Sequence, residues 1–353
     1  EGEYVFRDLL RHLRGEGPQP ESGVCFRRGG EAIHTGRAEL IQDLDALPLP
    51  SYDCIDFEVY SRSAERKSVD SPPLFPYARI MTSRGCPYGC VFCQVEIISG
   101  RKFRPRSAES VLDEIQWLRE TYGVRSIIFD DDNLFTDRRR AEAIFSGMIE
   151  RGLAMPWVTI ATAVFRLDED LIRLMRESGC RYICIAIESG DERVLKEVIG
   201  KPVNYEHAKR MVRVAREAGI YVAANFIVGF PTETWDEIRR SIRFAEELDV
   251  DYVKLFHAIP LRKTRLWELC EATGAFRRDF SQQTLRWNTG QIETEHFSAN
   301  DLTILRAYEW DRINFTSEEK RRRTAEMMGV SEEELLEVRR RTLLGAHRRI
   351  CDG

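Results

Sequence analysis

Three cysteines lie close together in the sequence, at Cys86, Cys90 and Cys93, with the spacing C-x3-C-x2-C. The chain has nine cysteines in all, and the others are scattered along it. An odd number of cysteines with one tight group is typical of a metal site in a reducing compartment, because a disulfide framework would use pairs spread through a small secreted chain. The three thiols are therefore candidate ligands of one metal centre.

The loop around these cysteines is built to wrap tightly. Gly85, Pro87 and Gly89 alternate with the cysteines and let the backbone fold closely around a compact object. A structural zinc site closes its shell with a fourth Cys or His, and the nearest cysteine outside the group is Cys54. Three hypotheses stay open: a zinc site, a closed iron–sulfur cluster completed by Cys54, and a cuboidal cluster with one iron left for an external ligand. The missing fourth ligand favours the last.

The elements that position this loop follow a repeating pattern. From Tyr77 to about Cys270, short β-branched or aromatic runs alternate with amphipathic stretches, as in βα units around a parallel sheet. The cysteines come directly after the first run, at the strand end where βα barrels carry their chemistry. We therefore predict an α/β fold, a partial (β/α)6 TIM-like barrel. The six predicted strands are Ala78–Ser83, Ser126–Phe129, Trp157–Ala161, Tyr182–Ile187, Tyr221–Val228 and Tyr252–Phe256.

Helices are predicted between these strands from their periodicity and their end signals. Ser107 is placed to cap the first helix, and Thr234 and Glu237 have capping-box spacing at the start of the last. The predicted helices are Ala108–Thr121, Arg138–Arg151, Glu169–Glu177, Tyr205–Ala218 and Trp235–Glu247. Four regions follow from this pattern: an N-terminal helix over residues 1–16, a linker over 17–76, the barrel over 77–274 and a helical C-terminal extension over 275–353.

The composition excludes several classes of protein. Apolar residues make up 43% of the 353 residues and charged residues 31%, which is ordinary for a globular protein and unlike a disordered one. The 53 Lys and Arg against 58 Asp and Glu leave a formal net charge of -5, so no strong field favours nucleic acid. No apolar run is long enough to span a membrane, and no signal peptide is recognisable. We expect a cytoplasmic protein without a nucleic-acid partner or a membrane span.

The cysteine motif, with the aromatic Phe92 before its last cysteine and at the start of a βα barrel, resembles the radical S-adenosylmethionine (radical SAM) superfamily. The resemblance covers Tyr77 to Gly274. It implies that Cys86, Cys90 and Cys93 bind a 4Fe-4S cluster whose open iron binds the amino and carboxylate groups of SAM. It further implies reductive cleavage of SAM to methionine and a 5′-deoxyadenosyl radical, with a flavodoxin- or ferredoxin-type protein as electron donor.

The resemblance also implies contacts to SAM at the strand ends. After the second strand, Asp131, Asp132 and Asn133 stand where the superfamily has its Gly-Gly-Glu element, and one of them would accept from the SAM ammonium. The alternative is that this acidic run is only the turn into the next helix. Phe92 is expected to contact the adenine, and its alternative is packing in the core.

Two further strands carry expected SAM contacts. Glu188 follows an apolar run, and a buried carboxylate is unfavourable unless it binds something; the alternative is an ion pair with an arginine such as Arg166. The fifth strand resembles the superfamily's G-x-I-x-G stretch, with Asn225 in place of the first glycine. Ile227 would pack on the adenine and Gly229 would let the backbone approach it. Alternatively, Gly229 only forms the turn into a capped helix.

Within the superfamily, the chain most resembles the branch with an N-terminal cobalamin-binding domain. The resemblance lies in the E-G-E start, the Leu-Pro-Leu-Pro-Ser-Tyr-Asp linker and the G-F-P-T-E-T turn. Residues 1–16 would be the tail of that domain, most of which is missing from this sequence. The expected function is a cobalamin-dependent-type C-methyltransferase acting on a small molecule or a lipid precursor. The alternatives are a radical SAM cyclase or oxidoreductase without methyl transfer, and a structural iron–sulfur or zinc module.

Overall fold

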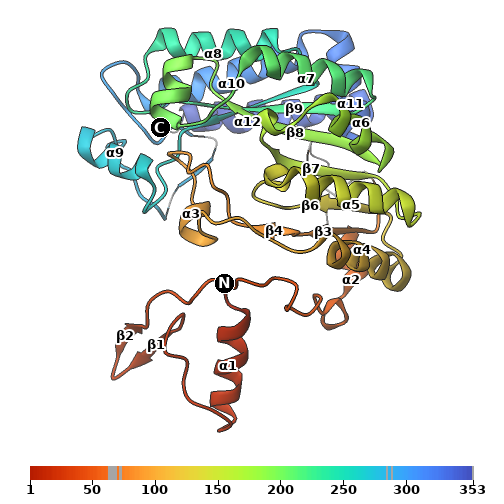
Figure 1. The fold of residues 1–353 in the computed structure, drawn as a ribbon. Helices are drawn as coiled ribbons and strands as arrows, with labels where there is room; N and C mark the ends of the chain where they lie inside the picture. The colour runs from red at the N-terminus through yellow and green to blue at the C-terminus, as the bar shows by residue number, and fades with distance from the viewer. Residues whose placement is uncertain (63–69, 71–73, 284, 288, 352–353) are drawn as a thin grey trace.

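A computed structural model describes all of the chain except residues 63–69, 71–73, 284, 288 and 352–353. Its central feature is one six-stranded parallel sheet with the order β10-β9-β8-β7-β6-β3 (Figure 1). The strands are β3 (Tyr77–Ile80), β6 (Ser126–Phe129), β7 (Trp157–Thr162), β8 (Cys180–Glu188), β9 (Tyr221–Val228) and β10 (Tyr252–His257). All six predicted strands are present, and the predicted α/β partial barrel is confirmed.

One predicted strand is shorter than expected. The first strand of the sheet ends at Ile80 because Ser83–Arg84 form a separate strand, β4, which pairs antiparallel with β5 (Arg104–Pro105). This small ribbon lies directly before and after the cysteine loop. It joins the two ends of the segment that carries the cysteines, so the loop is held at both sides.

Helices cover the outer face of the sheet (Figure 1). They are α4 (Ala108–Tyr122), α5 (Arg138–Glu150), α6 (Glu169–Glu177), α7 (Tyr205–Glu217) and α8 (Trp235–Glu247). The predicted caps are present: Ser107 Oγ accepts from the Ser110 amide at 3.1 Å, and Thr234 and Glu237 form a capping box. The sequence did not predict the single π-helical turn η4 (Val194–Ile199) that follows β8.

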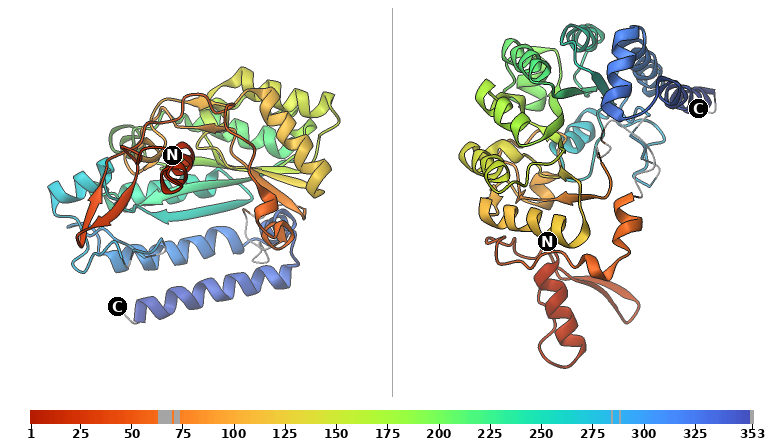
Figure 2. Two further views of the ribbon diagram at one scale, coloured as in Figure 1. Left: turned by 90° about the horizontal axis from the view of Figure 1, so that it is seen from below. Right: turned by 90° about the vertical axis from the view of Figure 1, so that its right-hand side faces the viewer.

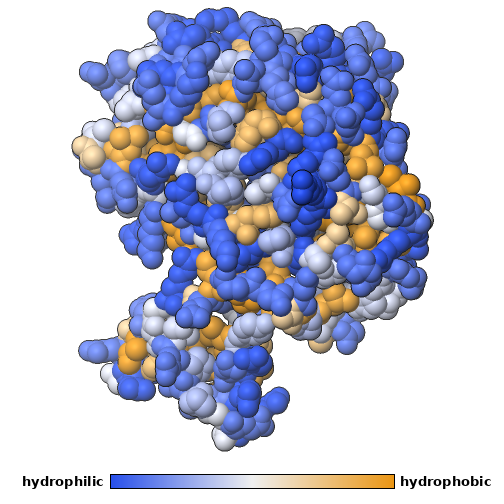
Figure 3. All heavy atoms as spheres, viewed as in Figure 1, coloured by the Kyte–Doolittle hydropathy of each residue, from blue (hydrophilic) through white to orange (hydrophobic). Residues whose placement is uncertain are grey.

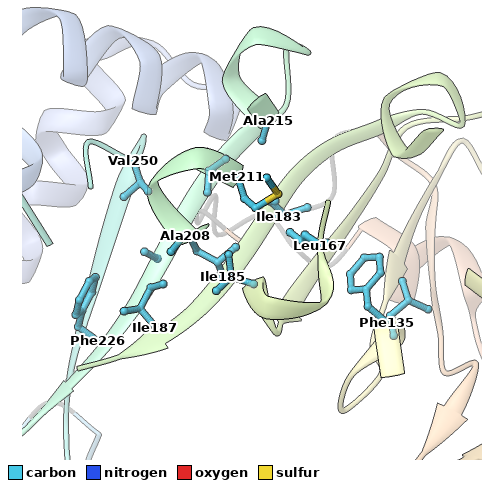
Figure 4. Close-up of a cluster of buried hydrophobic side chains, with 14 of the residues drawn as sticks. Phe135, Leu167, Ile183, Ile185, Ile187, Ala208, Met211, Ala215, Phe226 and Val250 are labelled. Atoms are coloured by element: carbon cyan, nitrogen blue, oxygen red, sulfur yellow. The ribbon is translucent and has the colours of Figure 1, made fainter. Parts of the chain in front are cut away.

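Side chains alternate between the two faces of the sheet. On β8, Ile183 and Ile185 point outward and belong to the large core beneath the helices, where they lie with Met211 and Ala208 of α7 (Figure 4). The inner face has its own smaller cluster, whose members are Tyr77, Ile128, Val158, Tyr182, Cys184 and Ala223. Because both faces are covered, the central strands read as continuous apolar runs in the sequence.

The N-terminal segment forms a separate layer below the sheet in Figure 1. It contains α1 (Glu3–Leu13) and an antiparallel pair, β1 (Cys25–Arg28) and β2 (Glu31–His34). The following short elements, η1 (Tyr52–Cys54) and α2 (Phe57–Arg62), pack through aromatic rings on the last turn of α4. The predicted N-terminal helix is therefore present, and part of the predicted linker lies outside the described residues.

The C-terminal extension is helical, as expected, with α9 (Arg265–Thr273), α10 (Ala299–Phe315), α11 (Glu318–Met328) and α12 (Glu332–Cys351). Helices α10 and α12 lie side by side (Figure 2). Asn314 of α10 joins this extension to the edge strand β10, since its amide accepts from the Val253 amide at 2.8 Å and donates to the Val253 carbonyl at 2.9 Å. Among the helices that the structure describes, none is long and apolar enough to cross a membrane.

Trp157 is the side chain whose loss should weaken this fold most clearly. It is fully buried, its ring stacks on Phe145 at 4.9 Å, and its indole nitrogen donates to Ser178 Oγ at 3.0 Å. We expect Trp157→Ala to lower the free energy of unfolding by about 3–5 kcal/mol, because it leaves a large cavity. Urea denaturation measures this change.

The matched control is Trp287→Ala, since Trp287 is 61% exposed. That variant should stay within about 0.5 kcal/mol of the wild type. Equal losses in the two variants would contradict the assignment of Trp157 to the core.

Candidate functional site

The cysteine loop lies at the carboxyl edge of the sheet, directly after β3 and β4. Gly85 begins it with φ +86°, and a Cβ at this position would lie 2.3 Å from the Lys102 carbonyl oxygen. Only glycine fits such a close approach of two backbone segments. The Cys86 amide donates to the Gly100 carbonyl at 3.3 Å, and the Cys93 amide donates to the Cys90 carbonyl at 3.0 Å. The chain is thus folded back on itself around the three cysteines.

The three thiols share one environment. Each of Cys86, Cys90 and Cys93 is half-buried, and this burial raises the pKa of each thiol. The negative charge of another cysteine of the group raises each pKa further, so the three sulfur atoms lie within electrostatic reach of one another. A metal centre would overcome both effects, since coordination deprotonates a thiol.

The chemistry of the donor set suits an iron–sulfur cluster, since thiolates are the usual ligands of such clusters. A tetrahedral zinc ion needs every ligand sulfur at about 2.3 Å from the same atom. In a cuboidal cluster each thiolate binds a different iron, so the sulfurs are farther apart. The three half-buried thiols of this loop could each bind a different iron.

Cys54, which the sequence left open as a fourth ligand, lies elsewhere. It ends the short helix η1, whose Tyr52 packs against Tyr122 in the last turn of α4. The cysteine loop precedes the first turn of α4, and this helix of 15 residues is about 22 Å long. Cys54 is therefore at the opposite end of α4 from the cysteine loop, and a closed cluster completed by Cys54 does not fit this arrangement.

The three polar residues after β6 have three different environments. Asp131 is buried, and its carboxylate accepts from the Thr82 hydroxyl at 2.8 Å, the Thr82 amide at 3.3 Å and the Ser83 hydroxyl, so it ties the end of β6 to the end of β3. Asp132 is half-buried and accepts from the Gly85 amide at 3.0 Å, which places it beside the cysteine loop. Asn133 is buried, and its Oδ1 has no hydrogen-bond partner among the described residues.

Asn133 Oδ1 is the observation that points most directly to a ligand. A buried amide oxygen without a partner loses the hydrogen bond that it would make in water. It is a suitable acceptor for an ammonium group brought by a ligand. Of the three residues, Asn133 is thus the one whose bonding is incomplete.

Glu188 ends β8 in a buried ion pair. Its Oε1 lies 2.8 Å from Nζ of Lys201, and both side chains are only 7% exposed. The backbone of Glu188 has φ +73°, a left-handed conformation that is uncommon for a residue with a side chain and is often found at functional sites. An ion pair, the alternative considered for Glu188, is therefore present, but its cation is Lys201 and not Arg166, which contacts the Tyr88 hydroxyl.

Lys201 was missed by the sequence analysis. It follows the unpredicted π-helical turn η4, and nothing in its local sequence marks it as buried. The signal that existed was indirect, because a buried Glu188 requires a cation. The charge of Lys201 also lowers the pKa of Cys90, against the larger effect of burial, so this ammonium lies close to the cysteine loop.

The remaining predicted contacts surround the turn after β9. Phe92 is half-buried and packs against the core, with its ring 6.4 Å from that of Phe230. Ile227 is almost fully buried, and by alternation it belongs to the inner face of β9. Gly229 has φ +88°, and a Cβ there would lie 2.5 Å from a methyl group of Leu302. The glycine therefore makes room for helix α10. This contact explains why position 229 is a glycine, and the local sequence gives no sign of it.

Glu233 holds this turn in place. Its Oε2 accepts from the amides of Gly229 at 2.6 Å and Phe230 at 3.1 Å, while its Oε1 is buried without a partner among the described residues. Burial raises the pKa of Glu233 to about 8, although the two amide hydrogen bonds act in the opposite direction.

Comparisons with known proteins agree with this geometry. The sequence profile of the radical SAM superfamily matches residues 80–245. The chain is 34% identical over 311 residues to an uncharacterized methyltransferase of Pyrococcus horikoshii, covering 86% of this chain and 64% of that protein. It is 33% identical over 323 residues to the cytidylyl-2-hydroxyethylphosphonate methyltransferase of Streptomyces wedmorensis, covering 83% of this chain and 60% of that one. The chain thus spans less than two thirds of the length of both relatives.

A solved structure with a similar fold is the cobalamin-dependent SAM radical enzyme OxsB with aqua-cobalamin bound. The TM-score is 0.56 at 23% sequence identity, and the match covers 77% of this chain and 38% of that one. This likeness supports the fold, a parallel sheet of a partial barrel with helices outside.

Removing Lys201 should destabilise the protein strongly. We expect Lys201→Met to lower the free energy of unfolding by about 3–5 kcal/mol, because it leaves the Glu188 carboxylate buried without its cation. The double variant Lys201→Met/Glu188→Gln should recover part of the lost stability. Urea denaturation of the wild type, the two single variants and the double variant completes this double-mutant cycle.

The control is Lys209→Met, which breaks a 3.2 Å pair with the well-exposed Glu247. Its effect should stay below about 1 kcal/mol. A double variant no more stable than Lys201→Met would contradict the role of the ion pair.

Glu233 should make stability depend on pH. A carboxyl group whose pKa is about 8 in the folded chain and near 4.3 when unfolded binds more protons when folded between these values. Its stabilising contribution is therefore complete below about pH 4 and decreases as the pH rises to about 8. Glu233→Gln should flatten this part of the stability curve, measured by urea denaturation from pH 5 to 9.

The matched control is Glu206→Gln, because the Glu206 side chain is 86% exposed. Its curve should run parallel to that of the wild type. A Glu233→Gln curve with the wild-type slope would contradict the raised pKa.

Proposed function

The chain belongs to the radical SAM superfamily, and from this premise we propose that it is the radical SAM part of a cobalamin-dependent-type methyltransferase. The observation that carries the proposal is the loop of three half-buried thiols at the carboxyl edge of the sheet. The names of the two relatives, both methyltransferases, support the choice of reaction. We further propose a small-molecule or lipid-precursor substrate and a cytoplasmic location.

The roles of the chain's residues follow from their positions. When bound, a 4Fe-4S cluster would supply the electron, received from a flavodoxin- or ferredoxin-type donor, that cleaves SAM to methionine and a 5′-deoxyadenosyl radical, and cobalamin would carry the methyl group. Cys86, Cys90 and Cys93 would hold the cluster through their sulfur atoms. Asp132, Glu188 and Lys201 lie within electrostatic reach of these thiols, since their charges act on the pKa values of the cysteines.

SAM carries an ammonium group and an adenine ring with apolar faces, and the chain offers a partner for both. We propose that Asn133 Oδ1 accepts from the ammonium, since this atom is buried without a partner in the described part of the chain. Asp132 and Glu188 add negative charge nearby. The adenine would pack between Phe92 and Ile227, next to the turn at Gly229.

The inner face of the sheet would protect a radical from water. Its lower layer is the buried cluster that contains Tyr77, Ile128 and Val158, and tightly packed apolar side chains leave no room for solvent there. Exclusion of water prevents side reactions of a reactive intermediate. The chemistry would therefore take place above this layer.

We propose that residues 1–16 are the tail of a cobalamin-binding domain. No residue of α1 is buried, although the helix is strongly amphipathic, and Phe6 and Leu13 are 62% and 72% exposed. Figure 3 shows hydrophobic surface in the lower part of the molecule, where this segment lies. An exposed apolar helix face of this kind would pack against a further domain. The two relatives are long enough to contain such a domain, because this chain spans only 64% and 60% of their lengths.

The decisive experiment measures SAM cleavage. After anaerobic reconstitution with iron and sulfide, the reduced protein should convert SAM to 5′-deoxyadenosine, detected by chromatography. Cys90→Ala should lose this activity by about 100-fold or more, together with most of its iron, because a cluster ligand is removed. Cys25→Ala is the matched control, since Cys25 is an exposed cysteine of the N-terminal segment and should leave both values unchanged.

Each alternative has its own result. Stoichiometric zinc and no SAM cleavage would overturn the proposal in favour of a structural module. Formation of 5′-deoxyadenosine without S-adenosylhomocysteine, when cobalamin is supplied to the chain with its preceding domain, would favour a cyclase or oxidoreductase. Formation of both products is the expected result.

A further inference from the structure

Three arginines contact the tip of the cysteine loop, which is the segment 87–89 between the first two cysteines. They come from three parts of the chain: one follows α3 (Val95–Ile98), one ends η3 (Val164–Arg166) and one begins α9. Helices α3 and α9 lie on the same side of the molecule (Figure 1). All three arginines are exposed. We call this set the arginine rim, and its members are Arg101, Arg166 and Arg265.

The arginine rim contacts the loop through groups that carry no net charge. The contacts are Arg101 Nη2 to the Pro87 carbonyl at 3.0 Å, Arg166 Nε to the Tyr88 hydroxyl, and Arg265 Nη2 to the Gly89 carbonyl. No carboxylate forms an ion pair with any of the three arginines in the part of the chain that the structure describes. Because a guanidinium stays protonated, the arginine rim keeps three positive charges without a partner of opposite sign.

The arginine rim also keeps hydrogen-bond donors. A guanidinium has five N–H donors, and each of the three arginines uses one of them in its contact with the loop. The other donors have no hydrogen-bond partner within the described residues. Arg151 at the end of α5 shows the contrast, because it pairs with both Glu109 and Asp113. The arginine rim can therefore bind carboxylates of another molecule.

The surface around the arginine rim is positive, although the chain as a whole has a formal net charge of -5. The segments that form or contact the cysteine loop are 87–102, 164–166, 197–201 and 262–265. Their exposed cations outnumber their exposed carboxylates by six to two. The cations are Arg101, Lys102, Arg166, Arg262, Lys263 and Arg265, and the carboxylates are Glu96 and Glu197. A local field of this sign attracts an acidic partner.

We infer that the arginine rim docks an acidic one-electron carrier protein of the flavodoxin type. Carboxylates on the surface of such a partner would meet unpaired guanidinium groups here, and the negative charge of the remaining surface would disfavour other orientations. The complex is expected to be weak and reversible, because electron-transfer encounters bury small interfaces. The inference rests on the proposed function, since only a chain that binds the cluster needs an electron at this loop.

Docking at the arginine rim would place the carrier next to the cluster ligands. Pro87 and Gly89 directly adjoin Cys86 and Cys90, so the contacted carbonyls lie one residue, about 4 Å along the backbone, from two of the three ligands. The step at this surface is the transfer of one electron. The carrier is oxidised by one electron and the cluster is reduced by one, and no bond or proton moves.

The alternative role of the arginine rim is to hold the loop in its shape. Substitution by glutamine separates the two roles, because glutamine keeps an amide donor for the loop and loses the positive charge. Substitution by lysine keeps the charge and loses the fork of the guanidinium. A docking surface should respond mainly to the charge, whereas a purely structural contact should respond to the donor geometry.

The test measures binding of oxidised flavodoxin to the full chain, reconstituted under anaerobic conditions, by isothermal titration calorimetry. We expect saturable binding that weakens as the salt concentration rises. The triple variant Arg101→Gln/Arg166→Gln/Arg265→Gln should bind flavodoxin at least about tenfold more weakly and with a smaller salt dependence. The corresponding triple lysine variant should stay within about threefold of the wild type, because it keeps all three charges.

The matched control removes three positive charges from the outer helices. It is Arg139→Gln/Arg213→Gln/Arg243→Gln, with one exposed arginine on each of α5, α7 and α8. This variant has the same net charge as the glutamine variant of the arginine rim and should bind flavodoxin as the wild type does. Equal weakening in the two triple variants would mean that only the net charge matters, and it would overturn the inference.

A second variant keeps the inference falsifiable if the glutamine variant of the arginine rim folds poorly or loses iron. Arg262→Gln/Lys263→Gln removes two exposed charges beside the arginine rim, and neither side chain has a hydrogen bond to the segment 87–89 among the described residues. It should weaken flavodoxin binding by about threefold. Wild-type affinity in this variant and in the variant of the arginine rim would overturn the inference.

Kinetics separate this inference from the proposed function. The ratio of flavodoxin-driven to dithionite-driven formation of 5′-deoxyadenosine should fall about tenfold in the glutamine variant of the arginine rim, because dithionite is a small reductant that needs no docking surface. Cleavage of SAM with dithionite, without binding of flavodoxin to the wild type, would overturn this inference alone. No cleavage with dithionite would overturn the proposed function, while the binding measurements still decide whether the arginine rim docks an acidic protein.

Discussion

The site depends on one constraint, the parallel arrangement of six strands, which brings all of their carboxyl ends to a single edge. The cysteine loop, Asp132, Asn133, Glu188 and the turn at Gly229 come from four different strands and meet only because of that arrangement. The same arrangement buries several polar side chains at this edge, and a buried polar group needs a hydrogen-bond or ion-pair partner. Asp131 accepts hydrogen bonds from Thr82 and Ser83, and Glu188 forms an ion pair with Lys201. Asn133 Oδ1 and Glu233 Oε1 have no such partner among the described residues.

Much of the fold was predictable because it is encoded locally. Alternating runs and capping signals mark the strands and helices, and the capping box of Thr234 and Glu237 is an example that the structure confirms. What could not be predicted depends on contacts between distant segments. The first strand ends early because Arg84 pairs with Arg104, and the turn η4 has no clear sequence signal.

The candidate site shows the same division between local and distant causes. The spacing of the cysteines identifies the candidate loop without any structure, since all three cysteines lie within eight residues. The alternative of an ion pair for Glu188 named Arg166 only as an example of a partner, and the fold selects Lys201 instead. The roles proposed for Phe92, Ile227 and the residues after β6 stay predictions, although their positions at the carboxyl edge agree with them.

Leu302 links the C-terminal helices to the shape of the candidate site. Because its side chain occupies the space that a Cβ at Gly229 would need, the shape of the β9 turn is determined jointly by two regions about 70 residues apart. Residues 275–353 are thus no detachable appendage of the barrel. A truncation after α9 would leave a hole beside that turn, and an exchange of α10 between homologues would have to be matched by compensating changes in β9, so the two segments are expected to evolve together.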